Sequence, residues 1–205
     1  MLVGSQALAV AAQDLGARAI IRAPLGVDVP GEVAEPDEPP HVLYAGRLSE
    51  EKGVRELAEA TEGTARVIVG NGPLRDLFPD AVGFVSPREL GSYYERAAVV
   101  VCPSRREGFG VVAREAMAYG RPVVATAVGG LVDAVEDGVT GLVVPPRDSA
   151  ALRMAIERLL GDRDLRRRLG GAGRDRARME FTWEAATSAT IAAYRTAATS
   201  AGTSG

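Results

Sequence analysis

The 205-residue sequence lacks features that several common classes of protein require. It has a single cysteine, Cys102, which excludes an internal disulfide; because Cys102 ends an apolar segment, we expect a buried thiol rather than a nucleophile. No apolar run approaches the roughly 20 residues that span a bilayer, and the chain does not open with a basic segment followed by an apolar core. A net charge of −3 gives no attraction to nucleic acid. These absences predict a cytoplasmic domain with no nucleic-acid partner.

Motifs for common cofactors and metals are missing too. The sequence has no G-x-G-x-x-G after a strand and no G-x-x-x-x-G-K-[ST], which argues against a dinucleotide-dependent dehydrogenase and a P-loop NTPase. The one histidine, His41, begins a predicted strand. No Cys/His spacing, and no Asp-x-Asp near a phosphate-binding loop, is available to hold a metal. We therefore expect no metal, no cofactor and no nucleophilic catalysis by a serine, cysteine or histidine cluster.

What the sequence does contain is an alternation of apolar strands and helices, which predicts an α/β fold with a Rossmann-like, doubly wound parallel sheet. The predicted strands are 41–45, 65–69, 81–85, 97–102, 122–125 and 141–144, and the predicted helices are 54–61, 88–96, 111–119, 131–136 and 149–160. Ligands of such sheets bind beyond the carboxyl ends of the strands. We therefore expect Gly46, Gly70, Ser86 and the 104–110 loop, which follow strand ends, to meet at one rim.

The stretch E-G-F-G-V-V-A-R-E, from Glu107 to Glu115, is the most informative part of the chain. It joins a predicted strand to a predicted helix, so the N–H groups of Phe109, Gly110 and Val111 would face an anion at the positive end of the helix dipole. The two flanking carboxylates would repel a phosphate and are better suited to accept hydrogen bonds from hydroxyl groups, as sugars offer. The stretch predicts a ligand with hydroxyls on both sides of a phosphate.

A second anion-binding feature follows the first predicted strand, in the run A-G-R-L-S-E-E-K-G. Lys52 falls in the first turn of a predicted helix, where its charge opposes the helix dipole, and Arg47 just before it does the same. Two cations at this place predict a shared diphosphate, with arginine as a fork and lysine as a point charge. Taken alone, the two cations favour surface ion pairs with Glu50 or Glu51; together with the glycine-rich loop, they favour the diphosphate.

Four motifs in this order resemble the C-terminal, donor-binding half of the retaining GT-B glycosyltransferases of family 4 (group 1): A-G-R-L-S-E-E-K-G-V, G-N-G-P-L, E-G-F-G-V-V-A-R-E and V-G-G-L-V-D-A-V-E-D-G-V-T-G-L-V-V-P-P-R-D. The resemblance implies a nucleoside-diphosphate sugar as substrate and metal-independent hexosyl transfer with retention at the anomeric carbon. The sequence departs from the family pattern at Asp133, where glutamate is common, and at Leu25, where asparagine is frequent.

The resemblance also implies roles for individual residues. Arg47 and Lys52 would hold the diphosphate and Glu107 would contact the transferred sugar, so these three are the expected catalytic residues. The donor-binding residues that it implies are Gly46 at a strand end, Gly70 and Gly72 in a loop that closes on the diphosphate, Val85, Ser86 and Leu90 around the base, Phe109, Gly110 and Val111 through their main chain, and Glu115 at the ribose hydroxyls.

The length of the chain suits one domain with appendages, whereas the enzymes that it resembles have two such domains. Residues 1–28 resemble the end of an acceptor-binding domain, with a helix in S-Q-A-L-A-V-A-A-Q-D-L and a strand in A-R-A-I-I-R. A proline-rich linker at 29–40 is expected to pack against nothing. The nucleotide-sugar-binding domain is predicted at 41–180, a C-terminal helix at 181–197 and a disordered tail at 198–205.

Three functional interpretations stay open. The chain is the donor half of a glycosyltransferase, a nucleotide-sugar epimerase of the same architecture, or a non-catalytic nucleotide-sugar-binding fragment. We expect the chain alone to bind nucleoside diphosphates weakly and to transfer nothing until an acceptor domain is supplied. The base, the sugar, the acceptor and the oligomeric state are not encoded in any motif, and contact with a membrane surface would come through the missing domain.

Overall fold

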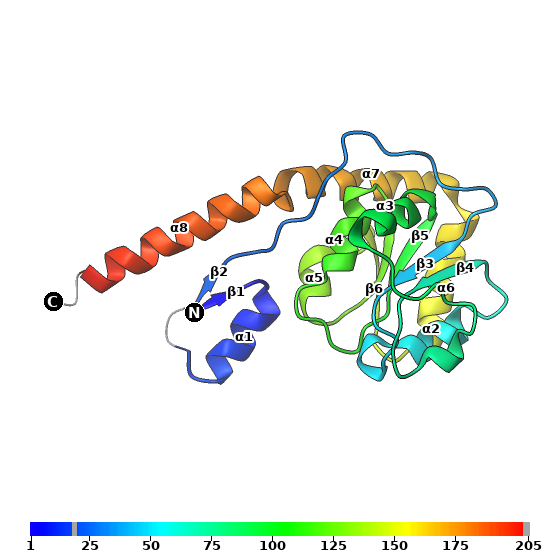
Figure 1. Cartoon of the computed structure of the whole chain (residues 1–205), viewed down its shortest axis with the longest axis horizontal. Coiled ribbons are helices and arrows are strands. Elements are labelled where there is room, and N and C mark those ends of the chain that lie inside the picture. The colour runs from blue at the N-terminus through cyan, green and yellow to red at the C-terminus, as the bar shows by residue number, and fades with distance from the viewer. Residues whose placement is uncertain (18–19, 203–205) are drawn as a thin grey trace.

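The computed structural model describes residues 1–17 and 20–202, and a parallel sheet of five strands in the order β4-β3-β5-β6-β7 forms its centre (Figure 1). The strands are β3 (Val42–Ala45), β4 (Arg66–Val69), β5 (Val99–Cys102), β6 (Val123–Thr126) and β7 (Gly141–Val144). The order reverses between β3 and β5, because β4 lies on one side of β3 and the later strands lie on the other. This confirms the doubly wound α/β sheet and places its switch point at the ends of β3 and β5.

Helices connect the strands and cover both faces of the sheet (Figure 1). They are α2 (Val54–Ala60), α3 (Pro87–Arg96), α4 (Val111–Ala118), α5 (Gly130–Ala134) and α6 (Ser149–Gly161), followed by α7 (Arg163–Glu180) and α8 (Trp183–Gly202). Each of the five predicted helices is confirmed to within two residues at either end. Short 3-10 turns at Glu50–Lys52 and Arg75–Leu77 complete the connections that follow β3 and β4.

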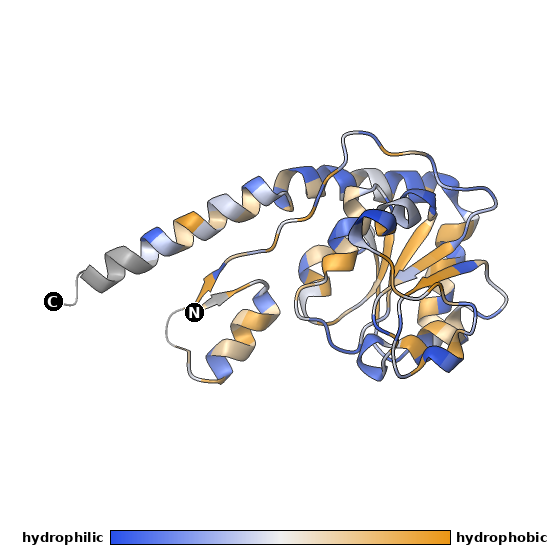
Figure 2. Cartoon of the chain, viewed as in Figure 1, coloured by the Kyte–Doolittle hydropathy of each residue, from blue (hydrophilic) through white to orange (hydrophobic). Residues whose placement is uncertain are grey.

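The core forms two layers because successive residues of a strand point to opposite faces of the sheet. In β3, Val42 and Tyr44 pack with buried residues of α2 and α6, whereas Leu43 and Ala45 pack with buried residues of α3, α4 and α5. Most strand residues are buried and apolar, and they are orange in Figure 2. Burial of each valine or leucine stabilises the fold by about 1.5–3 kcal/mol. The double cover holds the strand ends, and therefore the loops that follow them, in fixed positions.

The predicted strand at 81–85 is wrong. Only Gly83 of this segment forms bridges to the end of β4, at Val69 and Gly70. Gly83 has a φ of 92°, a left-handed conformation that interrupts an extended strand. The apolar residues after Gly83 therefore are not covered by a sheet, and Phe84 is 88% exposed.

The linker at 29–40 contains no helix or strand, but the prediction that it packs against nothing is wrong. Arg121 donates a hydrogen bond to the carbonyl of Ala34, and Arg174 donates to the carbonyls of Pro30 and Gly31, at 2.9 Å each. Arginines of the domain therefore hold the linker through its backbone, an attachment that the linker's own composition does not reveal.

The N-terminal segment forms a small unit of its own, in which β1 (Leu2–Val3) pairs in parallel with β2 (Ile21–Arg22) and α1 (Gln6–Asp14) lies between them in sequence. The predicted helix is confirmed. The predicted strand A-R-A-I-I-R is confirmed at Ile21 and Arg22 only, and its residues 18–19 lie outside the described part of the chain.

Helix α8 runs away from the sheet as a single rod (Figure 1). The helix ends at Gly202, so the prediction that it stops at 197 and that a disordered tail begins at 198 is wrong for residues 198–202. An alanine-rich sequence with no glycine or proline before Gly202 favours continuation of the helix. Residues 203–205, the rest of the predicted tail, are not among those described. In the described part of the chain no helix is both long and apolar enough to cross a membrane.

Candidate functional site

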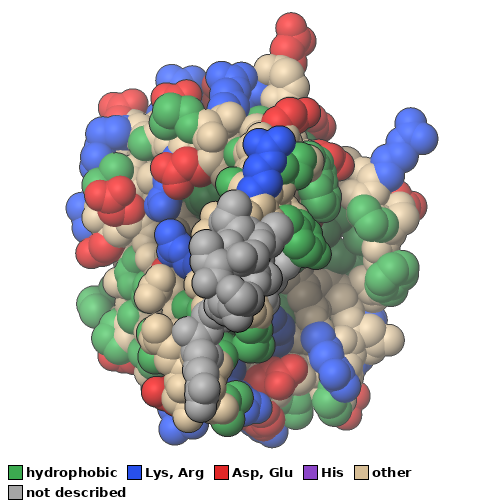
Figure 3. All heavy atoms as spheres, turned by 90° about the vertical axis from the view of Figure 1, so that its left-hand side faces the viewer, with side chains coloured by type: hydrophobic (Ala, Val, Ile, Leu, Met, Phe, Trp, Pro, Cys, Tyr) green, Lys and Arg blue, Asp and Glu red, His purple; other side chains and the backbone are tan. Residues whose placement is uncertain are grey.

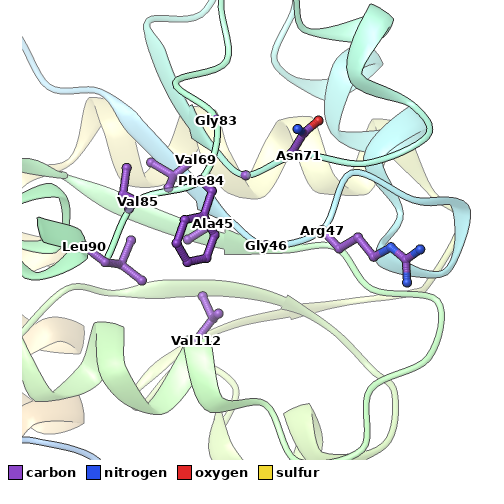
Figure 4. A pocket seen from close by; sticks show the side chains of 11 residues that line it. Ala45, Gly46, Arg47, Val69, Asn71, Gly83, Phe84, Val85, Leu90 and Val112 are labelled. Atoms are coloured by element: carbon purple, nitrogen blue, oxygen red, sulfur yellow. The ribbon is translucent and has the colours of Figure 1, made fainter. Parts of the chain in front are cut away.

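A cavity of about 370 Å³ opens at the carboxyl ends of β3 and β4, on the side of the sheet that α3 and α4 cover (Figure 4). Its lining residues are Ala45, Gly46, Arg47, Val69, Gly70, Asn71, Gly83, Phe84, Val85, Leu90 and Val112. The predicted residues Gly46, Arg47, Gly70, Val85 and Leu90 are thus brought together around one cavity. Apolar side chains dominate its lining, and such a cavity suits a flat ligand group with apolar faces.

Phe84, Asn71 and Val112 line the cavity but were not among the predicted site residues. The ring of Phe84 points into the space between Val85, Leu90 and Val112, as Figure 4 shows. The sequence signal for Phe84 is its position directly after Gly83, but the apolar pattern of 81–85 predicts a buried strand instead. The sequence signal for Val112 is its position on α4, one helical turn before Glu115 and therefore on the same face of the helix.

A second, smaller cavity of about 50 Å³ continues the first toward the loop after β5 and shares Ala45, Gly46 and Val112 with it. Its polar lining comes from Lys52, Ser104 and Glu107. The two cavities together therefore pass from an apolar end, beside α3, to a charged end beside the glycine-rich loop. This gradient lies at the switch point of the sheet, where a parallel α/β fold binds its ligands.

The predicted glycines bring two loops into close contact. A Cβ atom on Gly70, whose φ is 142°, would lie 1.8 Å from the carbonyl oxygen of Gly46. On Gly72, a Cβ would lie 2.3 Å from the carbonyl oxygen of Leu48. The N–H of Leu48 donates to the carbonyl of Asn71 at 2.9 Å. Side chains at either glycine would force the loops after β3 and β4 apart, so these residues shape the cavity without contributing a functional group.

Arg47 is exposed, and its guanidinium extends away from the apolar wall of the cavity (Figure 4). Its backbone is held from below, because the hydroxyl of buried Tyr44 donates to the carbonyl of Arg47 at 2.8 Å. Burial, aided by Cys102 and Glu107, raises the pKa of Tyr44, so that this hydroxyl keeps its proton. Within residues 1–17 and 20–202, no acidic side chain forms an ion pair with Arg47, and its charge is available to a ligand.

Lys52 forms an ion pair with Glu107, with 2.7 Å between Nζ and Oε2. This is neither of the pairs that the sequence suggested, since Glu50 pairs with Arg55 and Arg105 and Glu51 lies near Arg106. Burial acts to raise the pKa of Glu107, but the hydrogen bond and charge of Lys52, together with the N–H groups of Gly110 and Phe109, bring it below its ordinary value. Glu107 is therefore an anion that already occupies the positive end of the site.

The glycine-rich loop is packed tightly against the turn before α5. Gly110 precedes α4 as its N-cap, with a φ of 78°, and the N–H of Gly130 donates to the carbonyl of Glu107 at 3.0 Å. A Cβ on Gly129 would lie 1.8 Å from that carbonyl. The expectation that the N–H groups of this loop all face an open anion site needs correction, because those of Phe109 and Gly110 stabilise the carboxylate of Glu107.

Glu115 lies on α4 and accepts a hydrogen bond of 2.8 Å from the hydroxyl of Tyr94 on α3. Burial raises the pKa of Glu115, an effect that the bond from Tyr94 opposes and the charge of Asp28 reinforces. Tyr94 also stacks on Tyr119, with 5.4 Å between ring centroids. Tyr94 was not predicted; the signal for it was its position one helical turn after Leu90.

Several predicted residues do not line either cavity, namely Gly72, Ser86, Phe109, Gly110, Val111 and Glu115. The hydroxyl of Ser86 is engaged as the N-cap of α3, where it accepts from the N–H of Glu89 and donates to the carboxylate of Glu89 at 2.6 Å. The side chain of Phe109 is buried beneath the loop. In the described residues, His, Cys, Asp and Glu side chains do not gather in groups of three or more that could hold a metal ion.

Comparison with known proteins adds independent findings. A family model described as "Glycosyl transferases group 1" matches residues 39–162. The glycogen synthase of Mycobacterium tuberculosis is 36% identical over 175 residues, which are 76% of this chain and 42% of that protein. The chain thus spans less than half the length of this curated relative.

Two solved structures share the fold. Sucrose-phosphate synthase from Thermosynechococcus elongatus superposes with a TM-score of 0.84 at 32% identity, covering 97% of this chain and 58% of that one. The C-terminal domain of a glycosyl transferase group 1 family protein from Francisella tularensis gives a TM-score of 0.65 at 27% identity, and the match covers 77% of this chain and 99% of that domain. The sheet and helices of this chain therefore match the C-terminal, Rossmann-like domain of GT-B proteins.

Proposed function

The chain belongs to the group 1 glycosyl transferases, and from this membership we propose that it binds a nucleoside-diphosphate sugar as the donor half of a retaining, metal-independent hexosyltransferase of family 4. The observation that carries the proposal is the pair of adjoining cavities at the switch point, one apolar and the other charged, which share Ala45, Gly46 and Val112. A nucleoside diphosphate has the same polarity along its length. Net negative charge and a buried thiol are consistent with action in the cytoplasm.

The base of the donor occupies the apolar end. Val85, Leu90 and Val112 form a surface for one face of the ring, and Phe84 is placed to stack on it. Aromatic stacking of this kind contributes about 0.5–1.5 kcal/mol beyond the area that it buries. Glu115 and Tyr94, one helical turn further along α4 and α3, lie beside this end, where the carboxylate accepts hydrogen bonds from the ribose hydroxyls.

The diphosphate lies between Arg47, Lys52 and the start of α4. When the bond between sugar and diphosphate breaks, negative charge grows on the diphosphate and positive charge on the anomeric carbon. Arg47, Lys52 and the N–H of Val111 would neutralise the negative charge without a metal ion, since preorganised donors of this kind lower the barrier. To reach the diphosphate, Lys52 must exchange part of its 2.7 Å contact with Glu107 for a phosphate oxygen.

Glu107 then has two successive roles. In the free protein it holds Lys52 and satisfies the N–H groups of Phe109 and Gly110. With donor bound, its carboxylate is free to accept hydrogen bonds from the sugar and to orient it. The match covers 42% of the Mycobacterium tuberculosis relative, and we propose that the chain alone binds the donor without transferring the sugar.

Isothermal titration calorimetry with UDP and GDP tests this proposal. We expect one of the two to bind, and we expect K52A and E115A to weaken it by about tenfold each, the loss that one charge-assisted contact explains. R96A is the matched control, because Arg96 forms an exposed ion pair with Asp37, at 2.8 Å, outside both cavities. Affinity that is the same in K52A, E115A and R96A would rule out the site.

A further inference from the structure

Arg114 lies on α4 within the stretch from Glu107 to Glu115, but it lines neither part of the proposed donor site. The side chain is 4% exposed and lies between two aromatic rings, with its guanidinium carbon 3.8 Å from the ring centre of Phe109 and 4.9 Å from that of Phe181. Neighbouring Glu115 turns instead toward Tyr94. The two side chains thus point in different directions from α4, and Arg114 takes no part in the proposed contact between Glu115 and the donor.

The hydrogen bonds of Arg114 all end on the backbone of the glycine-rich turns. Its Nη1 donates to the carbonyl of Phe109, to that of Gly110 at 3.4 Å and to that of Gly130 at 3.5 Å. The turns that carry these carbonyls are packed so closely that a Cβ on Gly130 would lie 2.5 Å from the carbonyl oxygen of Phe109. One buried cation therefore gathers three carbonyl dipoles from the two sides of the loop.

The orientation of these carbonyls fixes the orientation of the N–H groups that face the site. In a planar trans peptide, the C=O of one residue and the N–H of the next point in opposite directions. A guanidinium that holds the C=O of Phe109 on the core side therefore directs the N–H of Gly110 to the other side, where it stabilises the carboxylate of Glu107. By the same geometry, holding the C=O of Gly110 directs the N–H of Val111 outward.

Burial of the Arg114 guanidinium costs free energy, so packing alone does not explain why a charged residue occupies this position. Burial lowers the pKa of Arg114 to about 10, with Asp133 acting in the opposite direction. Its Nε is buried and has no hydrogen-bond partner among the described residues. An apolar side chain of similar length would fill the space between the two rings without either penalty.

We propose that Arg114 is a positioning residue for the anion site: without touching the donor, it sets the peptide planes of Phe109 and Gly110 so that the N–H groups of the loop point at Glu107 in the free protein and at the diphosphate in the complex. The second half of this inference rests on the proposed donor site, whereas the first half concerns the free protein alone. The test separates the two halves.

The variants are R114M, R114K and R166Q, each made in the full chain. Methionine keeps an unbranched apolar stem between the rings, so R114M is expected to fold, and lysine restores a cation without the fork. Arg166 is the matched control, a buried arginine that also donates only to carbonyls, those of Leu159 and Leu160, far along the chain from the loop. Carbon-13 NMR titration of the Glu107 carboxyl and calorimetry with UDP and GDP are the two measurements.

We expect R114M to raise the pKa of Glu107 and to weaken nucleoside diphosphate binding by about tenfold, because peptide planes that are no longer held direct their N–H groups less well. R114K should recover part of both effects, and R166Q should show neither. A folded R114M with the Glu107 pKa of the unaltered chain overturns the inference, whatever its affinity. If R114M does not fold, R114K decides instead: because lysine lacks the fork, its Glu107 pKa should still lie above that of the unaltered chain, and an unchanged pKa overturns the inference. If the unaltered chain binds no nucleotide, the proposed function fails, and the titration of Glu107 still tests the role of Arg114.

Discussion

Glu107 and Glu115 end one nine-residue stretch, and their surroundings move their pKa values in opposite directions. Burial acts to raise both. At Glu107, the contact with Lys52 and two backbone N–H groups outweighs burial, whereas at Glu115 a single bond from the Tyr94 hydroxyl does not. Neutral donors stabilise a carboxylate less than a cation does. The two glutamates therefore behave differently toward pH and toward a bound anion.

The first prediction concerns the repulsion between Glu107 and a diphosphate. E107Q should bind the preferred nucleoside diphosphate several-fold more tightly, because it removes a half-buried negative charge and releases Lys52. The same variant should lose any preference for the sugar nucleotide over the nucleoside diphosphate. Calorimetry measures both, with E51Q as the control, since Glu51 lies 3.8 Å from exposed Arg106 and outside both cavities. Weaker binding of the nucleoside diphosphate to E107Q would contradict the assigned arrangement of charges.

The second prediction concerns stability and pH at Glu115. Because the pKa of Glu115 is raised in the folded state, the unfolded chain releases its proton first as the pH rises, and folding loses stability above the ordinary glutamate pKa of about 4.3. E115Q does not titrate, and its amide oxygen still accepts a hydrogen bond from Tyr94. Urea unfolding should therefore show E115Q to be the more stable protein at neutral pH, with the difference vanishing below that pKa. If E115Q differs from the unaltered chain in stability by the same amount at acid and at neutral pH, the raised pKa of Glu115 is contradicted.

At the scale of elements, the site is built from the loops that follow β3, β4 and β5, and close contacts between glycines hold these loops together. Gly70 is the clearest case, because its Cβ would meet the backbone of Gly46 rather than a movable side chain. Neither loop can retreat without disturbing the hydrogen bond from the N–H of Gly46 to the carbonyl of Val69, at 2.9 Å.

The third prediction follows from this contact. G70A should lower the free energy of unfolding by clearly more than G63A, and it should also weaken nucleotide binding. Gly63 has a left-handed φ of 75° with open space around it, so its substitution costs only the backbone strain of about 1–2 kcal/mol. G70A adds a steric clash to a backbone conformation that non-glycine residues avoid. Chemical denaturation of both variants measures the difference, and equal losses would show that the loops move apart freely.

The elements themselves were largely predictable, because apolar runs bounded by glycine, proline or charge mark most strands and helices of this fold. The exception at 81–85 arises because an apolar segment around Gly83 has the pattern of a buried strand, whereas Phe84 and Val85 line a cavity instead. The wall that contains Gly46, Arg47 and Gly70 was predictable from strand ends. The pairing of Lys52 with Glu107 was not, since 55 residues separate them and only the sheet order brings their loops together.

At the scale of the whole molecule, the N-terminal unit is attached directly to the glycine-rich loop. The hydroxyl of Ser5 donates to the carbonyl of Gly108 at 2.6 Å, and the backbone N–H of Gln6 donates to Asp133 at 2.7 Å. Asp133 therefore serves the first turn of α1 from a different part of the chain. Asp133, one of the two residues at which the sequence departs from the family pattern, thus has a defined contact with α1.

Helix α8 leaves the sheet on the same side as the N-terminal unit (Figure 1), and near its start the indole of Trp183 donates to Asp28 at 2.9 Å. Ile191 and Tyr194 further along are exposed. The view toward this end shows hydrophobic side chains standing among charged ones, with no single type covering the visible face (Figure 3).

The fourth prediction tests the attachment of α1. D133A should speed amide hydrogen exchange in α1 by up to about tenfold while leaving β3 unchanged, because loss of a capping acceptor costs about 0.5–2 kcal/mol. D148A is the control, since Asp148 accepts from the N–H of Ala151 at 2.8 Å as the N-cap of α6 and does not contact α1. If D133A and D148A leave exchange in α1 equally slow, Ser5 and the packing of α1 hold the unit without Asp133.

The most direct test of the central claim is a crystal structure of the chain with the nucleoside diphosphate that binds best. We predict that the base lies against Val85 and Leu90, and that a phosphate oxygen lies within hydrogen-bond distance of the Lys52 ammonium and near the start of α4. A nucleotide bound anywhere other than this cavity, or bound there with its diphosphate turned away from Lys52, would contradict the account.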